Sequence, residues 1–130
     1  MPLSKDQILS AEDRETRTVS VHEWGGEVLL RTMTGTDRNA YEQSLIRVHG
    51  NQAVPNMANA SAKLLARCIV GEDGERLFTE AEIVELGKKS AAVLNRLADV
   101  AAEMNGLTDE AVEDLAGNSE AAPSGAFTSA

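Results

Sequence analysis

Within residues 17–33, apolar and polar residues alternate along two runs that are separated by Gly25-Gly26. Alternation with a period of two predicts β-strands that each have one buried face. A Gly-Gly pair can adopt the positive φ angles that a two-residue hairpin turn requires. We therefore predict a β-hairpin here, in which Trp24 pairs with Glu27 across the turn.

That pairing assigns the side chains of the hairpin to two faces. It places Val21 opposite Leu30 and predicts one apolar, buried face, formed by Val19, Val21, Val28 and Leu30. The other face is mixed and carries Ser20, His22, Trp24, Leu29 and Arg31. Because an isolated hairpin is only marginally stable in water, it must pack on helices or join strands of another copy.

Two capping boxes mark helix starts. Ser4 with Gln7 begins a short helix over residues 5–11, with Leu3 and Ile8 placed as a hydrophobic staple. Thr79 with Glu82 begins another, stapled by Phe78 and Ile83, which should end at a left-handed Gly87.

The remaining helices follow from apolar residues at helical spacing. We predict helices over residues 37–48 and 57–70, with a loop at 50–56 between them. The second of these carries an apolar stripe of Met57, Leu64, Leu65, Cys68 and Ile69. A further helix runs from Ser90 to Gly106, and a last short one begins at Leu107.

The expected fold class is α+β and mainly α-helical, with an N-terminal β-hairpin followed by about four to five short helices. At 130 residues the chain is long enough for one domain, which we place at residues 1–116. Residues 117–130 are rich in Ala, Ser and Gly, and we expect a disordered tail there because this composition buries too little apolar surface.

Charge narrows the choice of partners. The formal net charge is −9, and the last 34 residues hold seven acids and no base. Nucleic-acid binding requires basic clusters, so a nucleic-acid partner is not expected. No apolar run approaches the roughly 18 residues that span a bilayer, and the first residues lack the apolar stretch of a signal peptide.

Residues with catalytic or metal-binding chemistry are few. His22 and His49 are the only histidines, and Cys68 is the only cysteine. Their spacing matches no zinc motif, and Cys68 lies on an apolar helix stripe, where a small buried hydrophobe is expected rather than a nucleophile. We therefore expect a protein that is not an enzyme and that has no cofactor or metal ion.

Some apolar residues have a second interpretation as binding residues. Trp24 at the hairpin end fits a core or edge-packing position better, but it could also anchor a partner, together with the neighbouring Leu29 and Arg31. The stripe of Leu94, Leu97 and Met104 fits a core position better, but it could also cradle a partner helix.

The order and residues of several segments resemble the tail assembly chaperones of long-tailed, siphovirus-type bacteriophages. The segments are Glu23-Trp24-Gly25-Gly26, residues 33–42 (MTGTDRNAYE), 72–79 (EDGERLFT), 86–94 (LGKKSAAVL) and 104–108 (MNGLT). With the stretches between them they cover residues 3 to about 119. The family has no catalytic motif, so the resemblance carries over no active-site residue.

The resemblance implies a role in building the phage tail. Members of this family bind the long helical tape measure protein in the cytoplasm of the infected bacterium and keep it soluble until tube subunits polymerise around it. They are absent from the mature virion. A programmed ribosomal frameshift commonly yields a longer product that helps to recruit the tail tube protein.

Other functions remain open at this stage. A small structural tail or head–tail connector protein would be found in purified particles, whereas a chaperone would be missing. A small enzyme would need a site that the sequence does not display. The possible edge strands of the hairpin also make a homo-oligomer an expectation.

Overall fold

The hairpin is present, but its register differs from the predicted one. In the computed structural model, which describes residues 1–107, strand β1 (Thr16–Val21) pairs antiparallel with β2 (Gly26–Arg31), so that Val21 lies opposite Gly26 rather than Leu30. The turn is longer than two residues because a 3-10 helix η1 (His22–Trp24) and left-handed Gly25 (φ 78°) form it. The predicted two-residue turn was therefore wrong.

The predicted buried face is nevertheless correct. The register shift is an even number of residues, and an even shift keeps every side chain on its face of the sheet. Val21 and Leu30 are fully buried, and Val19 and Val28 pack against the core at its margin.

The second predicted helix ends earlier than expected. Helix α2 (Gly35–Ser44) is capped by Thr34, whose hydroxyl accepts a hydrogen bond from the Asp37 amide. The helix ends before residue 45. Strands β3 (Ile46–His49) and β4 (Gln52–Pro55) then form a second hairpin, where we predicted helix and loop. β-branched side chains favour strands, and Gly50 (φ 68°) supplies the turn.

The third predicted helix is shorter at both ends. Helix α3 (Ala60–Cys68) starts three residues later than predicted, and Ile69–Val70 leaves it as strand β5, which pairs with β2. The sheet order is therefore β1-β2-β5. Four residues of the predicted apolar stripe are buried, namely Leu64, Leu65, Cys68 and Ile69, whereas Met57 is exposed.

The Thr79–Glu82 capping box is confirmed and leads through a 3-10 turn η2 (Glu80–Glu82) into α4 (Ile83–Leu86). Gly87 follows but has φ −65°, so the predicted left-handed conformation was wrong. A Cβ at Gly87 would lie 2.5 Å from the Asn59 side-chain oxygen, which accounts for a glycine at this close approach.

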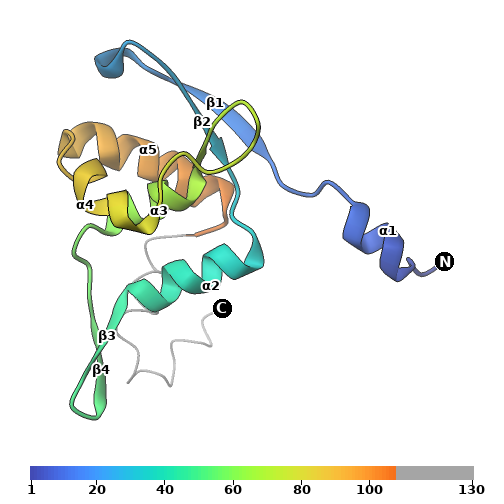
Figure 1. Cartoon of the computed structure of the whole chain (residues 1–130), viewed down its shortest axis with the longest axis horizontal. Coiled ribbons are helices and arrows are strands. Elements are labelled where there is room, and N and C mark those ends of the chain that lie inside the picture. The colour runs from blue at the N-terminus through green and yellow to red at the C-terminus, as the bar shows by residue number, and fades with distance from the viewer. Residues whose placement is uncertain (108–130) are drawn as a thin grey trace.

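The last described helix is α5 (Ala91–Met104), which Gly106 (φ 72°) closes as predicted. The sheet packs on α3 and α5, and α2 lies on the opposite side of these helices (Figure 1). The core lies between these layers and includes Val21, Leu30, Tyr41, Leu45, Leu65, Val93, Leu97 and Ala101. The predicted helix from Leu107 and the predicted tail at 117–130 lie outside the described residues.

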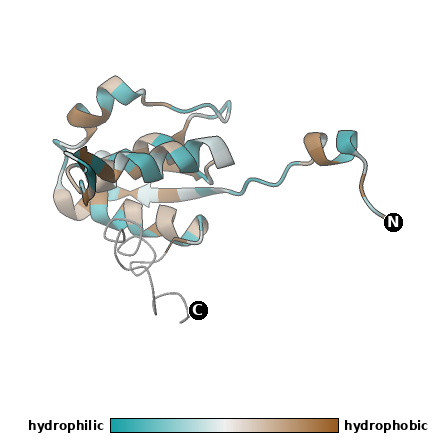
Figure 2. Cartoon of the chain, turned by 90° about the horizontal axis from the view of Figure 1, so that it is seen from below, coloured by the Kyte–Doolittle hydropathy of each residue, from teal (hydrophilic) through white to brown (hydrophobic). Residues whose placement is uncertain are grey.

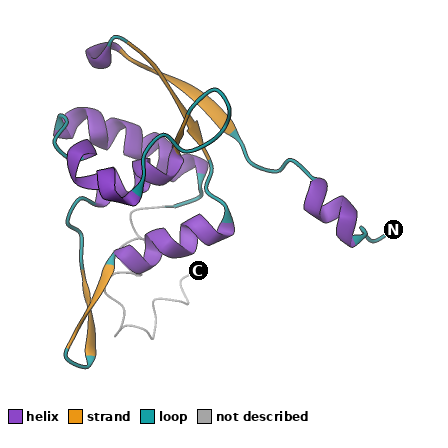
Figure 3. Cartoon of the chain, in the orientation of Figure 1, coloured by secondary structure: helices purple, strands orange, loops and turns teal. Residues whose placement is uncertain are grey.

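Two elements project from this body (Figures 1 and 3). One is the β3–β4 hairpin. The other is α1 (Lys5–Ser10), whose predicted capping box is present: the Gln7 amide donates to Ser4 Oγ at 3.1 Å, and the Ser4 amide donates to Gln7 Oε1 at 2.8 Å. None of the α1 residues is buried, and Figure 2 shows that α1, which is partly hydrophobic, lies apart from the body.

Candidate partner-binding surface

An apolar notch lies where the β1–β2 turn meets α4. Its lining residues are Trp24, Phe78, Glu85, Leu86 and Lys89, and its volume is about 230 Å³. Trp24 and Phe78 are partly buried and Leu86 is buried, so they form apolar walls, while Glu85 and Lys89 are exposed at the rim. A small apolar hollow with a charged rim suits one or two aliphatic side chains of a partner.

The turn holds Trp24 in the notch through an ion pair with α5. The two terminal guanidinium nitrogens of Arg96, Nη1 and Nη2, donate to the Glu23 carboxylate at 3.0 and 2.7 Å. These hydrogen bonds are the main reason that the pKa of Glu23 falls from its ordinary value of 4.5 to about 2. The ion pair therefore holds the β1–β2 turn, which carries the adjacent Trp24, against α5.

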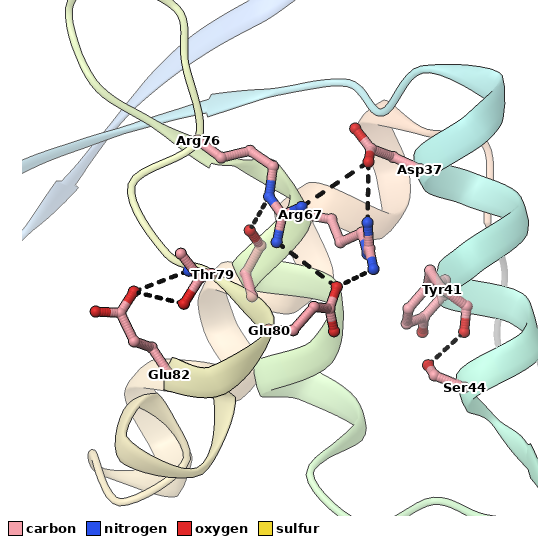
Figure 4. A network of polar contacts seen from close by, with 9 residues as sticks. Asp37, Tyr41, Ser44, Arg67, Arg76, Thr79, Glu80 and Glu82 are labelled. Carbon is pink, nitrogen blue, oxygen red and sulfur yellow. Dashed lines mark hydrogen bonds and ion pairs between the residues drawn. The ribbon is translucent and has the colours of Figure 1, made fainter.

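Phe78 forms the wall opposite Trp24, and a polar network holds the segment around it (Figure 4). Arg67 of α3 donates to Asp37 of α2 at 3.0 Å and also pairs with Glu80, and Arg76 donates its Nε–H to the Ala66 carbonyl at 2.9 Å. The Thr79 amide donates to the Glu82 carboxylate at 2.8 Å. Phe78 lies between Arg76 and Thr79 in the chain, so these bonds fix the segment that presents it.

A second hollow lies beside β2 and β5. Leu29, Val70 and Leu77 are among its lining residues, and its volume is about 290 Å³. Leu29 is half-buried there. Its neighbour Arg31 is held by the Gly74 carbonyl at 3.3 Å and pairs with Glu12 at 3.5 Å. Arg31 therefore supports the loop after β5.

The stripe proposed for a partner helix belongs to the core. Leu97 is fully buried, Leu94 is 6 % exposed, and Met104 packs against the core at its margin. A partner could reach Leu97 only if α5 left the body, whereas Leu94 lines a shallow pocket beside Gly87 and Lys89. Among the six predicted binding residues, Trp24 is thus the one that lines the notch, and Leu29 lines the separate hollow on the sheet.

Residues with catalytic potential are not gathered in one place. His22 lies in the β1–β2 turn and His49 in β3, and Cys68 is buried in α3. Burial raises the pKa of the Cys68 thiol to about 11, which disfavours the reactive thiolate. Residues 1–107 contain no group of His, Cys, Asp and Glu able to hold a metal ion. Nor is any helix among them long and apolar enough to cross a membrane.

Sequence reasoning missed three features of this surface. It did not connect Trp24 with Phe78, which it placed only as the staple partner of Ile83. It did not identify Lys89 as a rim residue. It placed α1 in the domain without noticing that its apolar residues would lack a covering surface.

Comparison with known proteins identifies the fold and the family of the chain. No curated protein matches the sequence. The structure of the bacteriophage HK97 tail assembly chaperone is similar, with a TM-score of 0.55 and 22% identity over 80% of this chain and 95% of that one, a likeness that shows the fold. The phage tail assembly chaperone family matches residues 5–118. Since this match spans most of the sequence, the chain belongs to the phage tail assembly chaperone family.

Proposed function

We propose that this chain binds the tape measure protein of its phage and keeps it soluble while the tail tube assembles, without catalysing a reaction. The family match over residues 5–118 carries the proposal. A protein of this role works in the host cytoplasm and is absent from the finished particle. A longer frameshifted product that recruits the tail tube protein belongs to the same proposal.

The notch supports this proposal because it offers an apolar surface to a partner. A long helical partner exposes apolar faces that aggregate unless they are covered. Trp24, Phe78 and Leu86 offer apolar walls at the surface, and Trp is strongly enriched among residues that dominate binding energy. We propose that an aliphatic side chain of a tape measure helix enters the notch.

The overall charge supports the same role. The formal charge of −9 makes copies of the chain repel one another, and a complex that carries several copies inherits that repulsion. Bound copies would therefore oppose precipitation of an otherwise insoluble partner.

Copurification tests the assignment of the notch. A tagged tape measure protein, co-expressed with the chain, should retain the wild-type chain and lose most of the Trp24→Ala variant. Val48→Ala is the matched control, because Val48 is exposed on the projecting hairpin and does not line the notch. Equal retention of the Trp24→Ala and Val48→Ala variants, both folded by circular dichroism, would remove the notch from the proposal.

The alternative is a small structural protein of the tail or of the head–tail connector. Mass spectrometry of purified particles separates the two functions. The chaperone role predicts that the chain is missing from particles in which tube and tape measure proteins are abundant. Its presence there at stoichiometric amounts would favour the structural role.

A further inference from the structure

The hollow beside β2 and β5, which we call the β2–β5 hollow, combines apolar walls with an acidic rim. Its apolar lining residues include Leu29, which is half-buried, and Leu77, which is 58 % exposed. Its charged lining residues are Glu27 and Glu72, and both are exposed. Within residues 1–107, the lining includes no Lys, Arg or His. The hollow therefore differs from the notch, whose rim carries both signs of charge.

The pairing of β2 with β5 accounts for the position of the two acids. Leu29 lies opposite Val70, and continuing this antiparallel register by two residues brings Glu27 opposite Glu72. Side chains two residues apart on a strand share a face, which agrees with the finding that both acids and Leu29 line one hollow. Like charges that face each other across neighbouring strands repel. The rim therefore lacks the cation that would neutralise it.

No cation of the described chain supplies this neutralisation. Glu27 and Glu72 take part in none of the ion pairs formed within residues 1–107. Arg31, which lies on the same strand as Glu27, is instead engaged by the Gly74 carbonyl and by Glu12. The β2–β5 hollow thus presents uncompensated negative charge at the edge of an apolar surface.

Backbone hydrogen bonds hold the loop that forms one wall of the hollow. The Leu77 amide donates to the Ile69 carbonyl at 3.1 Å, and the Gly71 amide donates to the Glu75 carbonyl at 2.9 Å. Even a Cβ at Gly71 would lie 3.2 Å from the Leu77 side chain, so a glycine here keeps the hollow open. Figure 1 shows the loop beside β2. A preformed hollow binds a side chain without the cost of ordering its walls.

The hollow and the notch lie on either side of one short segment. Leu77 lines the hollow, and the next residue, Phe78, lines the notch. A single partner can therefore contact both surfaces. This adjacency identifies the occupant of the hollow with the occupant proposed for the notch.

A lysine or arginine side chain has the chemistry that suits the β2–β5 hollow. Its methylene stem lies on apolar walls while its cationic head meets carboxylates at the rim. We propose that the hollow takes a Lys or Arg side chain of the tape measure protein, next to the aliphatic side chain that enters the notch. The inference rests on the proposed function and adds that the recognised segment of the partner is basic as well as apolar.

Charge reversal at the rim tests the contact with the full chain. A tagged tape measure protein, co-expressed with the Glu27→Lys/Glu72→Lys variant, should retain at least about tenfold less of it than of the wild type, because repulsion replaces attraction. Asp13→Lys/Asp99→Lys is the matched control. It changes the net charge equally at two exposed acids that line neither surface, and it should be retained like the wild type. Circular dichroism checks that both variants are folded.

A charge swap identifies the partner residue. Each Lys and Arg of the tape measure protein is replaced in turn by Glu. At one position the replacement should release the wild-type chain and restore retention of the Glu27→Lys/Glu72→Lys variant. The absence of any such position overturns the proposal.

The proposed function can fail separately from this inference. Retention of the Glu27→Lys/Glu72→Lys variant equal to that of its control overturns only the role of the hollow, and tape measure binding stands. A wild-type chain that the tape measure protein does not retain overturns both.

Discussion

At the scale of single residues, the Glu23–Arg96 pair joins the residue before Trp24 to α5. The pair is exposed, and exposed pairs contribute little to overall stability. Its position matters more than its strength, because it ties the tip of a hairpin to α5 beside the notch. The sequence contains one tryptophan, so fluorescence reports on this point directly.

Glu23→Gln should release the turn and shift the Trp24 emission at neutral pH, since an amide cannot replace the charged acceptor of Arg96. In the wild type, the lowered pKa means that the pair stabilises the fold fully above about pH 4.5 and ceases to do so as the pH falls toward 2. The emission difference between the two proteins should therefore be constant above pH 4.5, pass through its midpoint near pH 2 and vanish only below that.

Glu27→Gln is the matched control, because Glu27 is exposed on β2 and forms none of the ion pairs in the described chain. It should follow the wild-type emission throughout. An emission difference for Glu23→Gln that is absent at neutral pH would show that the ion pair does not position Trp24.

Local signals at the residue scale could be read well from the sequence. The capping boxes at Ser4 and Thr79 and the end of the last helix at Gly106 depend on neighbouring residues alone, and all three are present. The hairpin turn was misread because Gly25-Gly26 permits a two-residue turn but does not require one. The β1–β2 pairing instead takes Gly26 into the strand, a choice that depends on contacts outside the turn.

At the scale of elements, α5 is a core helix whose apolar stripe faces α3 and the sheet. The stripe includes Leu97, which is fully buried. Helical periodicity identified these positions correctly but could not separate a core face from a partner face, since both require the same spacing. The buried neighbours Leu65 and Leu30, which come from α3 and β2, complete the core that decides between the two.

Leu97→Ala should lower the free energy of unfolding by about 2–5 kcal/mol, as expected when a buried Leu leaves a cavity. Val84→Ala in α4 is the comparison, because Val84 is 59 % exposed and should cost less than about 1 kcal/mol. Chemical denaturation followed by circular dichroism measures both. A stable Leu97→Ala protein that fails only in tape measure binding would return Leu97 to the partner surface.

The β3–β4 hairpin shows where element prediction failed. Residues 46–48 follow the spacing of α2, and helical periodicity therefore extended the helix through them. In the structure, residues 46–48 instead form their backbone hydrogen bonds with residues 53–55. This pairing can be predicted only when the two segments are considered together. The same reason explains why β5, only two residues long, was assigned to α3.

At the scale of the whole molecule, the chain combines a packed body with surfaces that need partners. The notch lies beside the β1–β2 turn, and α1 lies beyond the other end of β1 (Figure 1). Such an arrangement suits a protein that holds another chain temporarily, because each contact is small and can be exchanged. The α+β fold class was predictable from the sequence, whereas these surfaces depend on how distant elements meet.

The central claim is that this chain keeps the tape measure protein soluble. The most direct measurement is the soluble fraction of the tape measure protein of the same phage, expressed alone and together with this chain at matched levels. We predict a several-fold higher soluble fraction with the chain present, and copurification of the two proteins. An unchanged soluble fraction without copurification would contradict the account.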